Sequence, residues 1–203
     1  MSDVKAPIAE RVDSLFCLRA FEKLEAVDAL ISAFHIEQKS DLLRHEICYC
    51  LGQMDNSPEH IKKIQAFLEK IVEGDYPQIV IHEAVEALGN LDDANTLALL
   101  EKYRNSNAEI SEMVIETCEL AQDLIKWNQA TNHGATEGIS QEKKANTNDP
   151  APAFNYEKDP QYADVAKLTA MALDDKNYSL FTRYRALFTL RDLNTAESCE
   201  AIC

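Results

Sequence analysis

The sequence contains little glycine and proline, with five Gly and six Pro in 203 residues. Folds rich in β-sheet use these residues in their turns, so their scarcity argues against such a fold and against a collagen-like or low-complexity chain. Hydrophobic residues make up 46% and charged residues 27% of the chain, which is ordinary globular composition. We therefore expect an all-α fold of one domain, or of one domain and part of another.

Basic residues are also scarce, because 20 Lys and Arg stand against 35 Asp and Glu, for a formal charge of −15. The resulting field repels phosphate backbones and anionic lipids, so we expect no nucleic acid and no membrane as partner. A cationic ligand or a basic protein surface fits this charge better. An acidic surface that only aids solubility is the commoner explanation.

Long apolar runs are absent, since no uninterrupted stretch approaches the roughly 18 residues of a membrane span. The N-terminus lacks the apolar core of a signal peptide, and we expect a cytoplasmic protein. The six cysteines include no CxxC pair, which argues against a disulfide framework or a structural zinc site. Four of them lie within apolar helical patterns and are expected in the core: Cys17, Cys48, Cys50 and Cys118.

One pattern recurs along the chain. Five stretches superimpose without gaps: RVDSLFCLR from Arg11, RHEICYCLG from Arg44, IHEAVEALG from Ile81, VIETCELAQ from Val114 and RYRALFTLR from Arg183. Gly52 and Gly89 are expected to end the first helix of their units, because glycine tolerates positive φ, and Pro58 suits the first turn of the next helix. Two helices per repeat predict an α-solenoid of helical hairpins, whose units bury their apolar faces by stacking.

The chain changes character near Asn128, and from there to Pro160 it is polar. This composition is typical of a linker or a surface loop. We therefore divide the chain into a helical half, 1–128, a polar linker, 129–160, and the first helical hairpin of a second half, 161–203. A solenoid usually ends in a polar capping repeat, so an ending at Cys203 is expected to leave an apolar edge.

Two of the five aligned stretches carry His-Glu at the same position, His45-Glu46 and His82-Glu83. Equivalent positions in adjacent units point the same way and lie about 10 Å apart, so we expect these four side chains to converge on one concave surface. Imidazole with carboxylate suits iron(II) or manganese, and zinc stays open. Two histidines and a carboxylate form the ligand set of non-haem iron oxygenases. The alternative is that both histidines are surface residues paired with neighbouring acids.

The other three histidines, His35, His60 and His133, have no partner at metal-ligand spacing and are expected to be exposed. Nucleotide-binding, α/β-hydrolase and zincin motifs are absent from the sequence.

The strings RHEICYCLGQM and IHEAVEALGNLDD, with LFCLRA, ETCELA and RYRALFTLRD, closely resemble the deoxyhypusine hydroxylase family over nearly the whole chain. The resemblance implies a HEAT-repeat protein of two pseudo-symmetric halves, each with two His-Glu motifs that together hold a di-iron centre. It also implies an iron-dependent monooxygenase that uses O2 to hydroxylate the deoxyhypusine side chain of a translation initiation factor, completing hypusine biosynthesis.

By position, the resemblance makes His45, Glu46, His82 and Glu83 the metal-site residues. His45, His82 and Glu83 would be direct iron ligands. Glu46, the expected catalytic residue, would bridge the irons or face the cationic amine of the substrate lysine. An acidic surface would suit such a substrate.

The third and fourth His-Glu motifs of the family have no counterpart in this sequence. Three explanations stay open: a piece of a longer reading frame, a truncated and inactive relative, or a chain that rebuilds the site as a homodimer. The alternative from another class is a non-catalytic HEAT-repeat scaffold that binds a basic protein partner. A single metal bound for stability is a third reading.

Overall fold

The computed structural model describes residues 3–21, 23–54, 57–106, 110–131 and 148–203. These residues form α-helices and one short 3-10 helix, and no strand occurs among them, so the all-α prediction is confirmed. None of the described helices is long and apolar enough to cross a bilayer. The predicted linker, 129–160, includes residues 132–147, which lie outside the described residues, as does His133.

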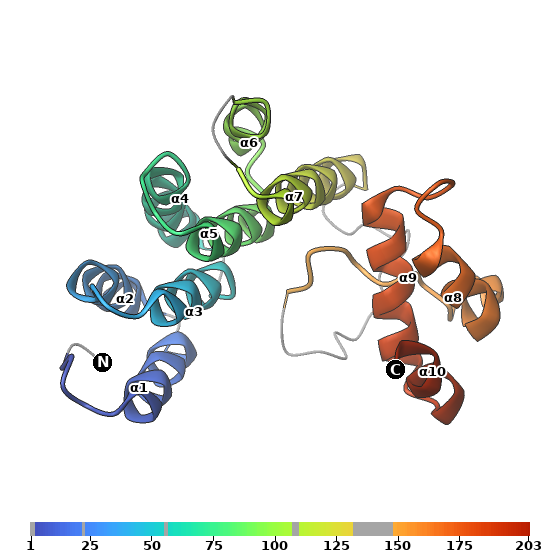
Figure 1. Ribbon diagram of the computed structural model, residues 1–203, viewed down its shortest axis with the longest axis horizontal. Coiled ribbons are helices and arrows are strands. Elements are labelled where there is room, and N and C mark those ends of the chain that lie inside the picture. Colours follow the sequence, from blue (N-terminus) through green and yellow to red (C-terminus); the bar gives the residue numbers. More distant parts are fainter. Residues whose placement is uncertain (1–2, 22, 55–56, 107–109, 132–147) are drawn as a thin grey trace. The chain divides into compact units, whose positions relative to one another are not determined.

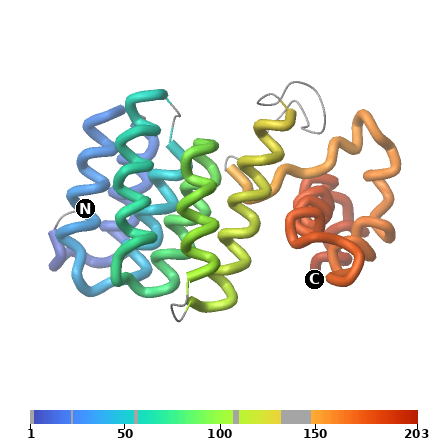
Figure 2. Tube along the Cα trace, turned by 90° about the horizontal axis from the view of Figure 1, so that it is seen from above, coloured from blue at the N-terminus to red at the C-terminus, as the bar shows by residue number. Residues whose placement is uncertain are grey.

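The chain divides into two compact units, Met1–Ala121 and Gln122–Cys203. The helices of the first unit are α1 (Ile8–Ala20), α2 (Leu24–Ile36), α3 (Asp41–Gly52), α4 (Pro58–Val72), α5 (Gln78–Leu91), α6 (Thr96–Arg104) and the first part of α7 (Glu112–Ala130). Helices α1, α3 and α5 pack side by side in one layer, and α2 and α4 pack against each other in a second layer (Figure 1, Figure 2). The aligned stretches at Arg11, Arg44 and Ile81 lie in α1, α3 and α5, so the predicted stacking of first helices is confirmed.

Gly52 and Gly89 permit close packing between neighbouring helices of the first layer. A Cβ atom at Gly52 would lie 2.6 Å from the Cβ of Ala87 in α5, and one at Gly89 would lie 3.0 Å from the Cβ of Ala121 in α7. Neither glycine adopts a left-handed φ, and α5 continues past Gly89 until Asp92 takes that conformation, with φ 58°. The prediction that Gly52 ends its helix is confirmed, since α3 ends there, whereas α5 runs on to Leu91 and the prediction for Gly89 is wrong. The space between helices, and not a left-handed φ, constrains both positions.

Leucines dominate the core of the first unit. Seven of the described leucines are completely buried there: Leu15, Leu30, Leu43, Leu51, Leu68, Leu88 and Leu100. Cys48, Cys50 and Cys118 are buried as predicted, whereas Cys17 is exposed. The prediction for Cys17 is wrong because α1 turns Arg11 and Leu15 inward, and Cys17 lies about 200° around the helix from Leu15.

The histidines outside the His-Glu pairs differ in burial. His35 is exposed, as predicted, but His60 is buried, with 8% of its surface accessible. His60 begins the buried stripe of α4 that continues through Ile64 and Leu68. Helical spacing therefore turns this imidazole inward, and the prediction that it is exposed is wrong.

A buried ion pair between Arg11 and Glu37 joins α1 to the end of α2. The Glu37 carboxylate also accepts hydrogen bonds from the backbone N–H groups of Lys39 (2.7 Å) and Ser40 (2.9 Å). Burial alone would raise the pKa of Glu37, but these two bonds and the Arg11 guanidinium outweigh it, and the pKa is lowered. The carboxylate thus fixes the connection that leads into α3.

The second unit contains the end of α7, the 3-10 helix η1 (Pro160–Ala163), α8 (Val165–Leu173), α9 (Leu180–Leu193) and α10 (Ala196–Ile202). Its core is small and apolar. The buried members are Phe154, Leu168, Met171, Ala186 and Leu190.

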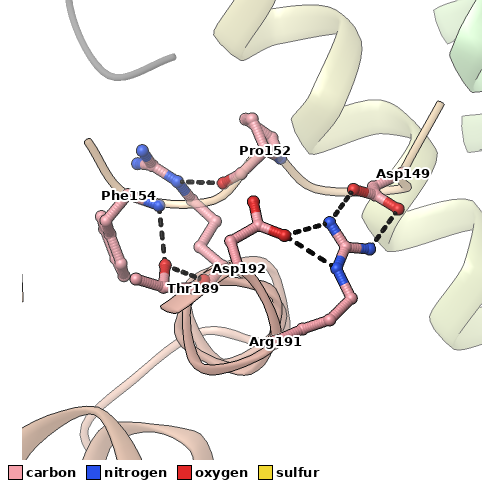
Figure 3. A network of polar contacts seen from close by, with 7 residues as sticks. Asp149, Pro152, Phe154, Thr189, Arg191 and Asp192 are labelled. Carbon is pink, nitrogen blue, oxygen red and sulfur yellow. Dashed lines mark hydrogen bonds and ion pairs between the residues drawn. The ribbon is translucent and has the colours of Figure 1, made fainter. Parts of the chain in front are cut away.

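Polar contacts attach the non-helical segment 149–154 to α9 (Figure 3). The Arg191 guanidinium donates two hydrogen bonds of 2.8 Å to the two carboxylate oxygens of Asp149. Arg185 Nε donates to the carbonyl oxygen of Pro152 at 2.9 Å. Both arginines are therefore anchored to the segment that precedes α8.

Candidate metal centre

The two His-Glu pairs lie next to each other in space. His45 is in α3 and His82 is in α5, two helices that pack together, and each histidine lies in the second turn of its helix. Their imidazole rings are stacked, with centroids 6.2 Å apart and planes inclined by 27°. The equal repeat phase of the pairs, which was the basis for predicting a shared site, therefore brings the two rings into contact.

Glu83 joins the two imidazoles in one cluster. Its Oε2 lies 3.0 Å from His45 Nε2. His45, His82 and Glu83 each offer one ligand atom, and these atoms all lie within 4.8 Å of one another. Metal–ligand bonds to imidazole and carboxylate are about 2 Å long, so small rotations of these side chains would suffice for all three to contact one cation. The donor set and its spacing fit a metal ion.

Glu46 lies on the other side of His45. Its Oε1 is 3.3 Å from His45 Nδ1, whereas Glu83 approaches Nε2 of the same ring. The side chain of Glu46 is 25% exposed, against 7% for Glu83. The four predicted residues are thus brought together, but the two carboxylates occupy different places: Glu83 is buried beside Nε2 of His45, and Glu46 is partly exposed beside Nδ1.

The two histidines have opposite pKa shifts. The hydrogen bond that His45 donates to the Glu83 carboxylate raises the pKa of His45, against the effect of burial, and the charges of Glu83 and Glu46 raise it further. Burial lowers the pKa of His82, and His45 adds to this effect while Glu83 opposes it. The cluster therefore stabilises the protonated form of His45 and the neutral form of His82, and a neutral imidazole is the form that binds metal ions.

The same repeat position in α7 adds nothing to the cluster, because Glu116 is exposed there. The contact from α7 comes from the following residue, Thr117, whose Oγ1 lies 2.7 Å from His82 Nδ1. Sequence reasoning missed this residue. The available signal was a hydroxyl at a repeat position where α3 has Ile47 and α5 has Ala84.

No protein-family model matches the sequence. Curated relatives do match it over nearly its whole length. The deoxyhypusine hydroxylase of Kluyveromyces lactis is 38% identical over 98% of this chain and 60% of that protein, and that of Gallus gallus is 36% identical over 98% and 60%. The deoxyhypusine hydroxylase of Drosophila melanogaster is 33% identical over 100% of this chain and 60% of that protein.

A solved structure is also similar. The structure of human deoxyhypusine hydroxylase in complex with glycerol superimposes with a TM-score of 0.77 at 33% identity, covering 98% of this chain and 62% of that one. The chain therefore spans about 60% of the length of the proteins that it matches.

Proposed function

Since this chain is a deoxyhypusine hydroxylase homologue that spans about 60% of its relatives' length, we propose that it supplies one iron(II) site of such an enzyme. In this proposal His45, His82 and Glu83 bind the iron, and Glu46 binds the substrate. The reaction is O2-dependent hydroxylation of the deoxyhypusine side chain of a translation initiation factor.

One observation carries the proposal: two imidazoles and one carboxylate offer ligand atoms within 4.8 Å of one another. This is the ligand set of non-haem iron(II) oxygenases, which leave other coordination positions open. When bound, iron would supply the activation of O2 that hydroxylation requires. The same donors accept manganese and zinc, so the identity of the metal is part of the test.

The three proposed ligands have complementary tasks. The buried carboxylate of Glu83 offsets the charge of a cation in a partly desolvated place. His82, neutral because of burial, offers a nitrogen lone pair directly. His45 is hydrogen-bonded to Glu83, and binding of a cation at its Nε2 displaces the proton held there.

Glu46 is the better placed of the two carboxylates to meet a substrate. It is partly exposed and lies next to His45, whereas the Glu83 side chain is only 7% exposed. A carboxylate in this place would pair with the cationic amine of deoxyhypusine. The net charge of −15 would favour the approach of a basic protein surface.

Anaerobic titration of metal-free protein with iron(II) tests the site. We expect about one iron per chain, and a loss of affinity of more than about 100-fold in His82→Ala and in Glu83→Ala, since each removes a ligand. His35→Ala is the matched control, because His35 is an exposed histidine on α2, and it should bind iron as the wild type does. Absence of iron binding would contradict the proposal and favour a scaffold.

Binding of a deoxyhypusine-containing peptide to the iron-loaded protein tests the role of Glu46. We expect Glu46→Gln to keep the iron and to bind the peptide about 10-fold more weakly, because one charge-assisted hydrogen bond contributes about 1.5 kcal/mol. Loss of iron in Glu46→Gln would instead make Glu46 a ligand. Bound iron without any peptide binding would indicate a metal that serves only stability.

A further inference from the structure

The side chain of Thr117 connects α7 to the cluster of α3 and α5. Its Oγ1 lies 2.7 Å from His82 Nδ1 and 2.7 Å from the carbonyl oxygen of Met113, one turn earlier in α7. Only 4% of the residue is exposed. Thr117 is thus a buried residue that contacts a proposed metal ligand and lies outside both His-Glu pairs.

The single hydroxyl proton of Thr117 decides the direction of both bonds. A carbonyl oxygen can only accept, so the hydroxyl donates to Met113. If the proton pointed at His82 instead, lone pairs of Thr117 Oγ1 and of the Met113 carbonyl oxygen would face each other at 2.7 Å. The Thr117 oxygen therefore accepts a hydrogen bond from His82, and His82 carries its proton on Nδ1. This leaves Nε2 with its lone pair.

Thr189 in the second unit makes the same two kinds of hydrogen bond, and there the donor to its hydroxyl oxygen is a backbone N–H group. Thr189 Oγ1 donates to the carbonyl oxygen of Arg185 at 2.6 Å and accepts the backbone N–H of Phe154 at 2.8 Å (Figure 3). A backbone amide can only donate. A threonine of this protein that is bonded to the carbonyl four residues earlier therefore does act as an acceptor, as Thr117 does toward His82.

We propose that Thr117 is a positioning residue, which holds His82 in its Nδ1–H tautomer and so presents Nε2 to a cation. The inference rests on the proposed function for the identity of that cation. Partners on the second nitrogen of a ligating histidine fix its tautomer and orientation and strengthen metal binding. Among the equivalent residues of other repeats, Ile47, Ala84 and Ala186 have no hydroxyl, and the hydroxyl of Ser14 in α1 donates to the carbonyl oxygen of Glu10.

The test compares Thr117→Val, which removes the hydroxyl at nearly equal volume, with Thr117→Ser, which keeps it. In metal-free protein labelled with 15N at histidine, long-range 1H–15N spectra distinguish the two tautomers of neutral His82. We expect Nδ1–H in the wild type and in Thr117→Ser, and loss of this preference in Thr117→Val. Iron(II) affinity, measured by competition with a chelator, should fall about 10- to 100-fold in Thr117→Val and stay within about threefold in Thr117→Ser.

Thr169→Val is the matched control, since Thr169 makes the same bond to the carbonyl of Val165 in the other unit, and it should leave iron affinity unchanged. A wild-type spectrum with the His82 proton on Nε2 overturns the inference whether or not iron binds. Wild-type iron affinity in Thr117→Val also overturns it. An Nδ1–H spectrum in a chain that binds no iron overturns the proposed function alone, so the two failures are distinguishable.

Discussion

The repeat position that carries His82-Glu83 in α5 carries Tyr184-Arg185 in α9, and the two places use their polar groups differently. Arg185 lies over the rings of Phe154 at 4.2 Å and Trp127 at 5.4 Å, and it donates to a backbone carbonyl. Burial lowers the pKa of Arg185 to about 10. In α5, by contrast, a buried carboxylate and a neutral imidazole are placed beside His45.

The polar groups around α9 hold parts of the protein together, whereas those of α3 and α5 form a candidate ligand site. Around α9, each arginine is matched to an acceptor of the protein itself: Arg191 to Asp149, and Arg185 to Pro152 and its aromatic neighbours. Around α3 and α5, donor atoms that suit a metal ion gather within a few ångströms of one another. We therefore expect substitutions near α9 to change folding, and substitutions of the histidines to change ligand binding. The predictions below run from the largest to the smallest expected effect on stability.

Removing the Arg185 side chain should detach the segment 149–154 from α9. Arg185→Ala leaves the carbonyl of Pro152 without this donor and removes the stacking on Phe154, so we expect the second unit to lose about 3 kcal/mol of unfolding free energy. Urea denaturation followed by Trp127 fluorescence measures this loss, because the chain has one tryptophan, and it lies against Arg185. Iron binding by the first unit should persist. A variant as stable as the wild type would show that the contacts of Arg185 do not anchor the segment.

Glu37 is a buried anchor within the unit that contains the proposed metal site. Glu37→Gln should cost about 2 kcal/mol, since the carboxylate accepts two backbone hydrogen bonds and pairs with buried Arg11. The pKa of Glu37 is lowered in the folded protein, so its contribution is present above the unfolded pKa, near 4.5, and is lost as pH falls through the folded pKa.

Stability measured from pH 6 down to pH 3 checks this expectation. The wild type should lose its advantage over Glu37→Gln across the acid range below about pH 4.5. Parallel pH curves for the two proteins would mean that the pKa of Glu37 is not lowered by folding.

Gly52→Ala should disturb the packing that sets the distance between α3 and α5. The new Cβ would lie 2.6 Å from Ala87 Cβ, so we expect a cost of about 1 to 2 kcal/mol in unfolding free energy. We also expect weaker iron binding, because the two helices carry the proposed ligands. Gly89→Ala is the matched comparison. Its Cβ would lie 3.0 Å from Ala121 Cβ, and a smaller cost is expected. Thermal unfolding and iron titration of both variants measure this, and a larger cost at Gly89 would contradict the packing argument.

The repeat phase of the sequence was enough to predict the helix pairs and the pairing of His45 with His82, because stacked units keep equivalent positions adjacent. Contacts between helices that do not follow the repeat alignment could not be predicted from the sequence. Thr117 reaches His82 from the next repeat, one position after the aligned pair, and only packing reveals this. The space that constrains Gly52 depends likewise on how closely α5 approaches.

The burial of single residues was also only partly predictable. A helical stripe turns His60 inward and leaves Cys17 outside, although the local sequence of each suggested the opposite. The two glutamates of the His-Glu pairs look identical in the sequence. Their different exposure depends on which neighbour each one meets, so the separate roles proposed for Glu46 and Glu83 could not be assigned from the motif alone.

The central claim is that the polar cluster of α3 and α5 exists to bind a metal ion and contributes little to folding. Its most direct test measures iron(II) affinity and unfolding free energy together in His82→Ala. The account predicts that iron binding is lost while the free energy of unfolding of the metal-free protein stays within about 1 kcal/mol of the wild type. A His82→Ala variant that unfolds, or one that still binds iron as the wild type does, would contradict it.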